Sequence, residues 1–173
     1  HKEYRRQRQM CIRDRYQLAH ETVTVAVLVW LWHRHQWAYR PLRTTIITVS
    51  FASLFAYRFF PLAPPRFALH GAVDTMLAHP VLFAGWKSIT GLSNLYAAMP
   101  SIHVAWAVWV AIAVNVASTH RLRRLAWIYP VITTVAVIGT ANHYVVDAVA
   151  GASATLIGWE LWRRFHPARH ELQ

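Results

Sequence analysis

The sequence predicts an all-α integral membrane protein, a helical bundle with five membrane spans in this chain and six in the intact protein. Of its 173 residues, 55% are apolar and only 14% are charged, whereas about a quarter of the residues are charged in ordinary soluble domains. The mean hydropathy of +0.23 points the same way. Because hydrocarbon offers no water to satisfy the backbone, helices are the expected state of any apolar segment that crosses it.

Five apolar segments support this prediction, each near the roughly 20 residues that a tilted helix needs to span a bilayer. They cover residues 17–32, 44–60, 102–117, 125–141 and 144–162. Tryptophan and tyrosine gather at the segment ends, as aromatic residues do at membrane interfaces. These aromatic residues are Trp30, Trp32, Trp37, Tyr39, Trp127, Tyr129, Trp159 and Trp162.

The two ends of the chain differ from the apolar domain between them. Residues 1–15 hold six of the eighteen Lys and Arg residues and show no apolar period. We interpret them as a non-native or disordered basic segment, the alternative being a native basic arm on a membrane surface. We expect residues 16–165 to form a single transmembrane domain and residues 166–173 a cytoplasmic tail. The chain opens on His1, and we expect a native first helix ahead of residue 16.

The distribution of arginine predicts which helix ends face the cytoplasm. Residues 33–43, 118–124 and 163–169 contain nine arginines, and alternating spans place all three stretches on one side. The opposite side holds three basic residues, Arg58, Arg66 and Lys87. Because positive charge is retained on the cytoplasmic side, we expect residues 61–101 and the turn at Asn142 to face outward from the cell membrane.

Composition excludes two other classes of protein. The net charge of +11 is compatible with nucleic-acid binding, but the basic residues form short clusters between apolar runs rather than one patch with interleaved aromatic residues. No nucleic-acid partner is therefore expected. The single cysteine, Cys11, excludes an intrachain disulfide framework and a cysteine-rich metal site.

The long outer connection, residues 61–99, is rich in proline and glycine. Pro61, Pro64 and Pro65 predict a stiff, extended start that presents Arg66, whose planar guanidinium suits phosphate. Residues 81–96 are moderately apolar and interrupted by glycine, which predicts a broken helix at the membrane interface.

A second polar set opens the third apolar segment. Pro100 is well suited to the first turn of a helix, and the Ser101 hydroxyl with the free backbone N–H groups of a helix start would point at an anion. His103 can give or take a proton near neutral pH.

The third polar set, His143 and Asp147, is a base and an acid inside apolar sequence. Four residues apart, they lie one above the other on a helix, and ionisable groups in a membrane span are costly unless they are paired. A carboxylate at Asp147 would hold His143 in one tautomer. With a phosphate-binding arginine and His103, the pair predicts phosphoryl transfer through a histidine nucleophile.

Each of these residues also has a purely structural interpretation. His103 could be a hydrogen-bonded residue of helix packing, His143 and Asp147 a structural pair, and Arg66 an ordinary headgroup contact. A dinuclear or haem site on His103 and His143 lacks a second carboxylate nearby to complete the usual ligand sets. The histidines in the loops and tails are not expected to take part in catalysis. They are His33, His35, His70, His79, His120, His166 and His170.

The three polar sets resemble the motifs of a known family. Residues 100–103, Pro-Ser-Ile-His, resemble the Pro-Ser-x-His second motif of the type 2 phosphatidic acid phosphatase superfamily, and His143-x-x-x-Asp147 resembles the end of its third motif. Residues 64–66, Pro-Pro-Arg, resemble the first motif as written in the bacterial branch close to inositol phosphorylceramide synthases. The similarity covers residues 58–158, and three motifs in order on one membrane side are more specific than any one of them.

The resemblance implies a membrane helical bundle in a bacterial cell membrane, with a metal-independent site at the membrane surface and no cofactor. In such a site, His143 attacks phosphorus and forms a phosphohistidine, Asp147 orients His143, and His103 protonates the leaving oxygen. Arg66 and Ser101 then hold the phosphoryl oxygens.

The sequence departs from the family pattern at two places. Seven residues separate Arg58 from Arg66 where the family has six, and Phe67 replaces a proline. Ala136 and Val137 occupy the positions of a Ser-Arg pair, so one phosphate-binding arginine is absent. This favours the phosphotransferase-like branch, or a site in which Arg58 takes over.

We therefore expect a membrane lipid phosphatase or phosphotransferase that acts on a lipid phosphate or diphosphate, with membrane lipids around it and water or an alcohol as acceptor. One alternative is a non-catalytic protein of the same fold that binds lipid phosphates as a scaffold. Another is a metal or haem protein, which would carry a bound metal or an absorbance band when purified.

Overall fold

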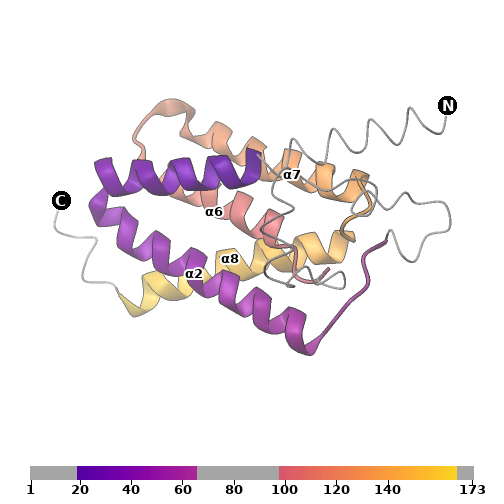
Figure 1. The fold of residues 1–173 in the computed structure, drawn as a ribbon. Coiled ribbons are helices and arrows are strands. Elements are labelled where there is room, and N and C mark those ends of the chain that lie inside the picture. Colours follow the sequence, from indigo (N-terminus) through magenta and orange to yellow (C-terminus); the bar gives the residue numbers. More distant parts are fainter. Residues whose placement is uncertain (1–18, 66–97, 167–173) are drawn as a thin grey trace, which may run out of the picture.

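The computed structural model describes residues 19–65 and 98–166, and this part of the chain is helical throughout its regular structure (Figure 1). A first helix covers residues 19–34. The remaining helices are α2 (Gln36–Phe59), α6 (Ile102–Ala117), the 3-10 helix η1 (Arg121–Trp127), α7 (Ile128–Gly139) and α8 (Val145–Phe165). The all-α prediction is thus confirmed. The expectations for residues 1–15, for Arg66, for the broken helix at 81–96 and for the tail beyond 166 lie outside the described residues.

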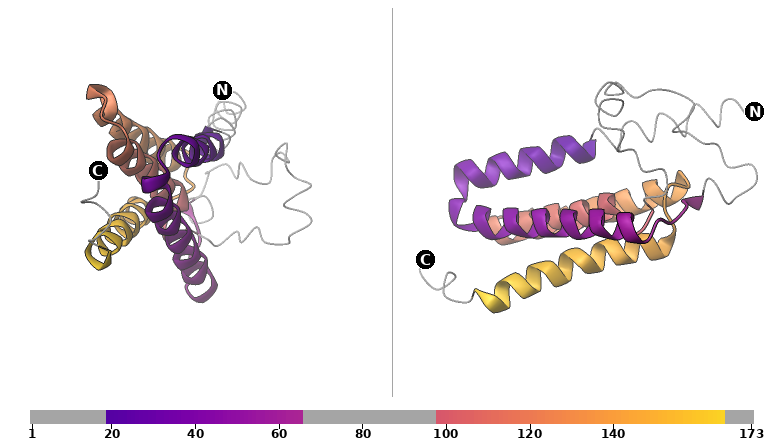
Figure 2. Two further views of the ribbon diagram at one scale, coloured as in Figure 1. Left: turned by 90° about the vertical axis from the view of Figure 1, so that its left-hand side faces the viewer. Right: turned by 60° about the horizontal axis from the view of Figure 1, so that its bottom comes forward.

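The helices run alongside one another as a bundle, with their connections at its two ends (Figure 2). One end carries the short connection at His35, the stretch from Ser118 to η1, and the end of α8. The other end carries the end of α2, the start of α6 and the turn between α7 and α8. This is the alternation that the sequence predicted. The predicted sidedness in a membrane stays a prediction.

The start of α2 corrects the prediction that residues 33–43 form a loop. The helix begins at Gln36, because Ala38, Pro41 and Leu42 lie buried in the bundle while Arg40 and Arg43 point to the exposed side. An amphipathic first turn therefore extends the helix into sequence whose charges had indicated a loop. The Leu42 carbonyl also accepts a hydrogen bond of 2.8 Å from the Trp109 indole N–H of α6.

One described helix is long and apolar enough to cross a membrane by itself, the continuous stretch Arg121–Gly139 with a mean hydropathy of 1.3. α6 is apolar but has only 16 residues. Many large apolar side chains on the outside of the bundle are exposed, among them Phe51, Val135 and Val149. The number of spans that the sequence predicted stays a prediction.

α6 is the central helix of the bundle. It packs against α2, α7 and α8, and ten of its 16 residues are buried, including Trp109. A polar contact ties α6 to α8, because the Thr155 hydroxyl donates to the Ala105 carbonyl oxygen at 2.9 Å. Such interhelical hydrogen bonds are typical of helices that pack in membranes.

Gly151 allows α8 to approach the start of α6 closely. A Cβ atom at this position would collide with the Ser101 carbonyl oxygen and would lie 3.4 Å from the Ala105 nitrogen. Because both obstacles belong to the backbone, no side-chain rotation can relieve the collision. The small residue at position 151 therefore sets the distance between these two helices.

We predict that Gly151→Ala lowers the free energy of unfolding by about 1–3 kcal/mol, the usual cost of overpacking. The matched control is Gly139→Ala, because a Cβ at Gly139 has nothing within 4 Å. Both variants are compared with the parent chain by chemical denaturation in detergent. Equal stability of the two variants would contradict this description of the helix contact.

Candidate functional site

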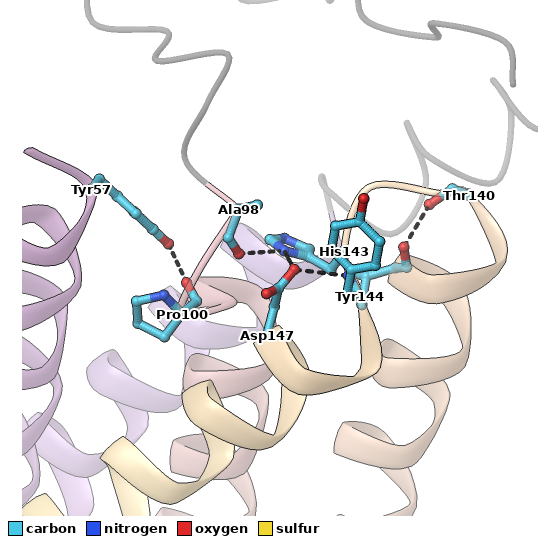
Figure 3. A network of polar contacts seen from close by, with 8 residues as sticks. Tyr57, Ala98, Pro100, Thr140, His143, Tyr144 and Asp147 are labelled. Atoms are coloured by element: carbon cyan, nitrogen blue, oxygen red, sulfur yellow. Dashed lines mark hydrogen bonds and ion pairs between the residues drawn. The ribbon is translucent and has the colours of Figure 1, made fainter. Parts of the chain in front are cut away.

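Four of the polar residues singled out in the sequence, Ser101, His103, His143 and Asp147, lie at one end of the bundle, and Figure 3 shows His143 and Asp147 there. Ser101 is the N-cap of α6, and His103 lies in the first turn of that helix. His143 belongs to the turn between α7 and α8, and Asp147 to the first turn of α8. Tyr57, near the end of α2, donates its hydroxyl hydrogen to the Pro100 carbonyl oxygen.

The turn that presents His143 is held by the last residues of α7. The Val137 carbonyl oxygen accepts hydrogen bonds from the backbone N–H groups of Asn142, at 3.1 Å, and of His143, at 3.3 Å. The Asn142 amide donates to the Thr140 hydroxyl at 2.8 Å. Ala141 has a φ of 54°, in the left-handed region that costs an alanine roughly 1 kcal/mol. The backbone therefore reverses within a few residues and places His143 at the start of α8.

The His143 side chain is oriented by a backbone carbonyl. Its ring nitrogen Nδ1 lies 2.8 Å from the Ala98 carbonyl oxygen, and the side chain is buried. Because a carbonyl oxygen can only accept a hydrogen bond, Nδ1 carries the proton in this contact. In the neutral ring, Nε2 is therefore the basic nitrogen.

Asp147 is buried one turn deeper in α8, and its carboxylate lies close to Tyr144 and to His143. Oδ2 accepts a hydrogen bond of 2.8 Å from the backbone N–H of Tyr144, the N-cap of α8. The same oxygen lies 3.7 Å from His143 Nδ1, which is beyond hydrogen-bond distance but close enough for charge attraction. The sequence predicted that the Asp147 carboxylate holds His143 in one tautomer. In the structure the Ala98 carbonyl makes the direct contact with Nδ1, and Asp147 lies beside it.

The start of α6 is attached to the start of α8. The Ser101 backbone N–H donates to the Asp147 carbonyl oxygen at 2.9 Å, so this N–H is not available to an anion, in contrast to the expectation from the sequence. Ser101 is fully buried, and its hydroxyl has no hydrogen-bond partner in the described part of the chain. The ring centroids of His103 and His143 lie 5.7 Å apart. The two predicted catalytic histidines therefore face one site.

The predicted phosphate-binding arginines are not seen in contact with this site. Arg58 is exposed in the last turn of α2, with its guanidinium carbon 5.9 Å from the centre of the Phe59 ring. Arg66 lies outside the described residues. Val137, at the position where the motif resemblance predicts an arginine, is fully buried in the core. In residues 19–65 and 98–166, no group of three or more His, Cys, Asp or Glu side chains could hold a metal ion.

Sequence reasoning missed three contributors to this end of the bundle. The Ala98 carbonyl and the Tyr57 hydroxyl have no sequence signal, because a backbone acceptor and a tyrosine in an apolar segment are both common. His20 is different. It is buried in the first helix with its ring centroid 5.2 Å from that of His103. A histidine inside a candidate membrane span is itself a signal of function.

A comparison with family models gives a match over residues 6–161, to a model described as the PAP2 superfamily. The chain belongs to the PAP2 superfamily. This confirms the resemblance that the three motifs indicated, and it assigns the chain to a family of lipid phosphatases and phosphotransferases, which are membrane proteins.

A curated relative of this PAP2 protein is the phosphoinositol dihydroceramide synthase of Bacteroides thetaiotaomicron. The two sequences are 30% identical over 128 residues, which cover 64% of this chain and 41% of the relative. The chain thus spans less than half the length of that relative. Its name agrees with the branch close to inositol phosphorylceramide synthases. No solved structure matches the chain.

Proposed function

We propose that this PAP2 protein transfers a phosphoryl or phospho-headgroup unit from a lipid phosphate or diphosphate to water or an alcohol, through a phosphohistidine at His143. The observation that carries the proposal is the 2.8 Å contact between His143 Nδ1 and the Ala98 carbonyl oxygen. It fixes the tautomer in which Nε2 holds the lone pair, as a histidine nucleophile requires.

In the first step, His143 Nε2 attacks phosphorus and forms the phosphorus–nitrogen bond. The bond from phosphorus to the leaving oxygen breaks, and that oxygen takes a proton from His103. The His143 ring gains positive charge while its Nδ1 hydrogen stays on the Ala98 carbonyl. The Asp147 carboxylate, 3.7 Å from Nδ1, stabilises this charge.

In the second step, water or an alcohol attacks the phosphohistidine. The attacking hydroxyl gives its proton to His103, a new phosphorus–oxygen bond forms, and the phosphorus–nitrogen bond breaks with its electrons returning to Nε2. His103 and His143 then have the protonation states in which they began. One histidine therefore acts as acid and then as base, and the other as nucleophile and then as leaving group.

The transferred phosphoryl oxygens need hydrogen-bond donors. The buried Ser101 hydroxyl has no partner among the described residues, and a phosphoryl oxygen would supply the acceptor that it lacks. We propose that Arg66 supplies the positive charge that binds the phosphoryl oxygens. Arg58 could also supply it after a change of its side-chain conformation. An arginine at either position would provide the planar donor set that Val137 cannot.

An apolar groove of about 440 Å³ begins beside the site and supports a lipid substrate. It runs between α6, α7 and α8, and its walls include Val145, Ala148 and Val149 from the first turns of α8. On α7, Val135 and Thr134 line it. A hydrocarbon chain in this groove would bring a phosphate at its end to the turn that carries His143.

Arginine is unevenly divided between the two ends, and this supports a site that faces outward from a bacterial cell membrane. In the described residues, the end that bears His143 has Arg58, whereas the opposite end has eight arginines. These are Arg34, Arg40, Arg43, Arg121, Arg123, Arg124, Arg163 and Arg164. Since positive charge favours the cytoplasmic side, the proposed site lies on the other side, in a bundle with five spans in this chain.

A second candidate function is lipid-phosphate binding without turnover. The observation that favours it is the fully buried Val137 at the position of a family arginine, because loss of a phosphate-binding charge weakens transition-state stabilisation more than it prevents binding. The two candidates differ in whether the chain turns over a bound lipid phosphate.

We predict that the purified chain in detergent releases or transfers phosphate from phosphatidic acid, prenyl diphosphate or a phosphoinositide, and that His143→Ala abolishes this activity. Loss of the nucleophile should lower the rate at least about a thousandfold, as expected for a residue that forms the covalent intermediate. His33→Ala, at an exposed position away from the site, is the matched control. Undiminished activity of His143→Ala would exclude the proposed nucleophile, whereas binding without turnover in the parent chain would favour the second candidate.

We also predict that Val135→Trp fills the apolar groove and discriminates between substrates by chain length. It should lower kcat/KM for a long-chain lipid phosphate about tenfold, equivalent to roughly two methylene groups no longer buried. A short-chain, water-soluble analogue should be affected much less. Ile132→Trp is the control, because Ile132 is similarly exposed on α7 but does not line the groove. Equal effects of the two tryptophans would argue against a lipid chain in this groove.

A further inference from the structure

The 3-10 helix η1 (Arg121–Trp127) lies between α6 and α7, at the end of the bundle opposite to the turn that carries His143 (Figure 1). In a 3-10 helix, side chains three residues apart lie directly above one another. The seven residues of η1 therefore form three rows, and none of the seven is buried. The rows are Arg121, Arg124 and Trp127; Leu122 and Leu125; and Arg123 and Ala126.

The row of Arg123 attaches η1 to the end of α6. The Arg123 guanidinium donates hydrogen bonds to the carbonyl oxygens of Asn115, at 3.3 Å, and of Ser118, at 3.0 Å. The Asn115 amide donates in return to the Arg123 carbonyl oxygen at 3.0 Å. These contacts satisfy carbonyl groups that the end of a helix leaves open. They also fix the rotation of η1, so that the other two rows are presented outward.

The row of Arg121 and Arg124 presents two positive charges that the described residues leave uncompensated. Both side chains are exposed, and neither guanidinium has an ion-pair partner within residues 19–65 and 98–166. Glu160 is the acidic residue that the structure places at this end of the bundle. Its carboxylate lies 2.9 Å from Arg164 and 3.7 Å from Arg163, so it is already engaged on α8.

The row of Leu122 and Leu125 is apolar and equally open. These leucines are 61% and 55% exposed, and Ile128 at the start of α7 continues their row at 52%. Two arginines beside two exposed leucines make η1 amphipathic, as in a segment that lies in the membrane interface. Trp127 ends the arginine row, and tryptophan is enriched at the depth of the lipid headgroups.

We propose that η1 is a binding site for an anionic phospholipid that is not the substrate. Arg121 and Arg124 hold its phosphate, for which the guanidinium group is the best-matched donor. Its hydrocarbon chains lie against Leu122 and Leu125. Because the site is at the opposite end of the bundle from His143, it is independent of the proposed function and needs no turnover.

The two rows together determine which ligand fits. The paired positive charges favour a headgroup with net negative charge, and they repel the ammonium group of a zwitterionic headgroup. The exposed leucines favour a lipid over a soluble phosphate, because only a lipid covers them. An anionic phospholipid supplies both the phosphate and the hydrocarbon.

Titration of the full chain with phosphatidylglycerol in neutral detergent tests the proposal, with the Tm as the measurement. We expect the lipid to raise the Tm of the parent chain by about 3–6 °C at saturation, and phosphatidylcholine to raise it much less. In the double variant Arg121→Gln/Arg124→Gln, the midpoint of the titration should move to an about twentyfold higher lipid concentration, roughly fivefold for each arginine.

The matched control is Arg163→Gln/Arg164→Gln, which removes two positive charges from the same end of the bundle. It also releases Glu160 from its ion pairs, so long-range charge alone would weaken lipid binding at least as much in this variant. We expect its midpoint to stay within about twofold of the parent value. An equal loss in the two double variants, or an unchanged midpoint in Arg121→Gln/Arg124→Gln, would overturn the proposal.

A third variant tests the apolar part of the site. Leu122→Ser/Leu125→Ser keeps both arginines, and we expect it to raise the midpoint about fivefold or more, because less hydrocarbon is covered. An unchanged midpoint here would contradict contact with the lipid chains. Glycerol 3-phosphate that stabilises the parent chain as strongly as the lipid would show a site for phosphate alone, and absence of any Tm rise in the parent would show no site.

Discussion

The hydrogen bond from the Ser101 N–H to the Asp147 carbonyl, at 2.9 Å, is the interaction on which the rest of the site depends. It joins the first residues of α6 to the first turn of α8, and it forms only because Gly151 lets the two backbones approach. His103 extends from one of these helix starts and His143 from the residues just before the other. A fixed distance between the helices therefore becomes a fixed distance between the two histidines, as catalysis by positioned groups requires.

Much of this arrangement could be predicted from the sequence, because the apolar pattern and the motifs are local. The predicted segment 102–117 coincides with α6, and the pairing of His143 with Asp147 at a helix start is present in the structure. The prediction that residues 33–43 form a loop was wrong. The burial of Ala38 and Leu42, which favours a helix there, depends on helices distant in the sequence. The role of the Ala98 carbonyl and the position of His20 beside His103 depend on the tertiary fold in the same way.

The candidate site combines a well-oriented histidine, the proposed nucleophile, with an incomplete set of positive charges among the described residues. His143 has both a backbone acceptor and a nearby carboxylate, whereas Val137, at the position where the motif resemblance predicts an arginine, is buried in the core. Under the proposed function, such a site forms a covalent intermediate at His143 and takes its phosphate-binding charge from Arg66 or Arg58.

The central claim is that the Ala98 carbonyl directs the chemistry of His143 to one ring nitrogen. The most direct measurement is nuclear magnetic resonance of the trapped phosphoenzyme, prepared with ¹⁵N-labelled histidine and a lipid phosphate. The account predicts phosphorus bonded to Nε2 of His143, with Nδ1 still protonated toward the Ala98 carbonyl. Phosphorus bonded to Nδ1, or to any residue other than His143, would contradict it.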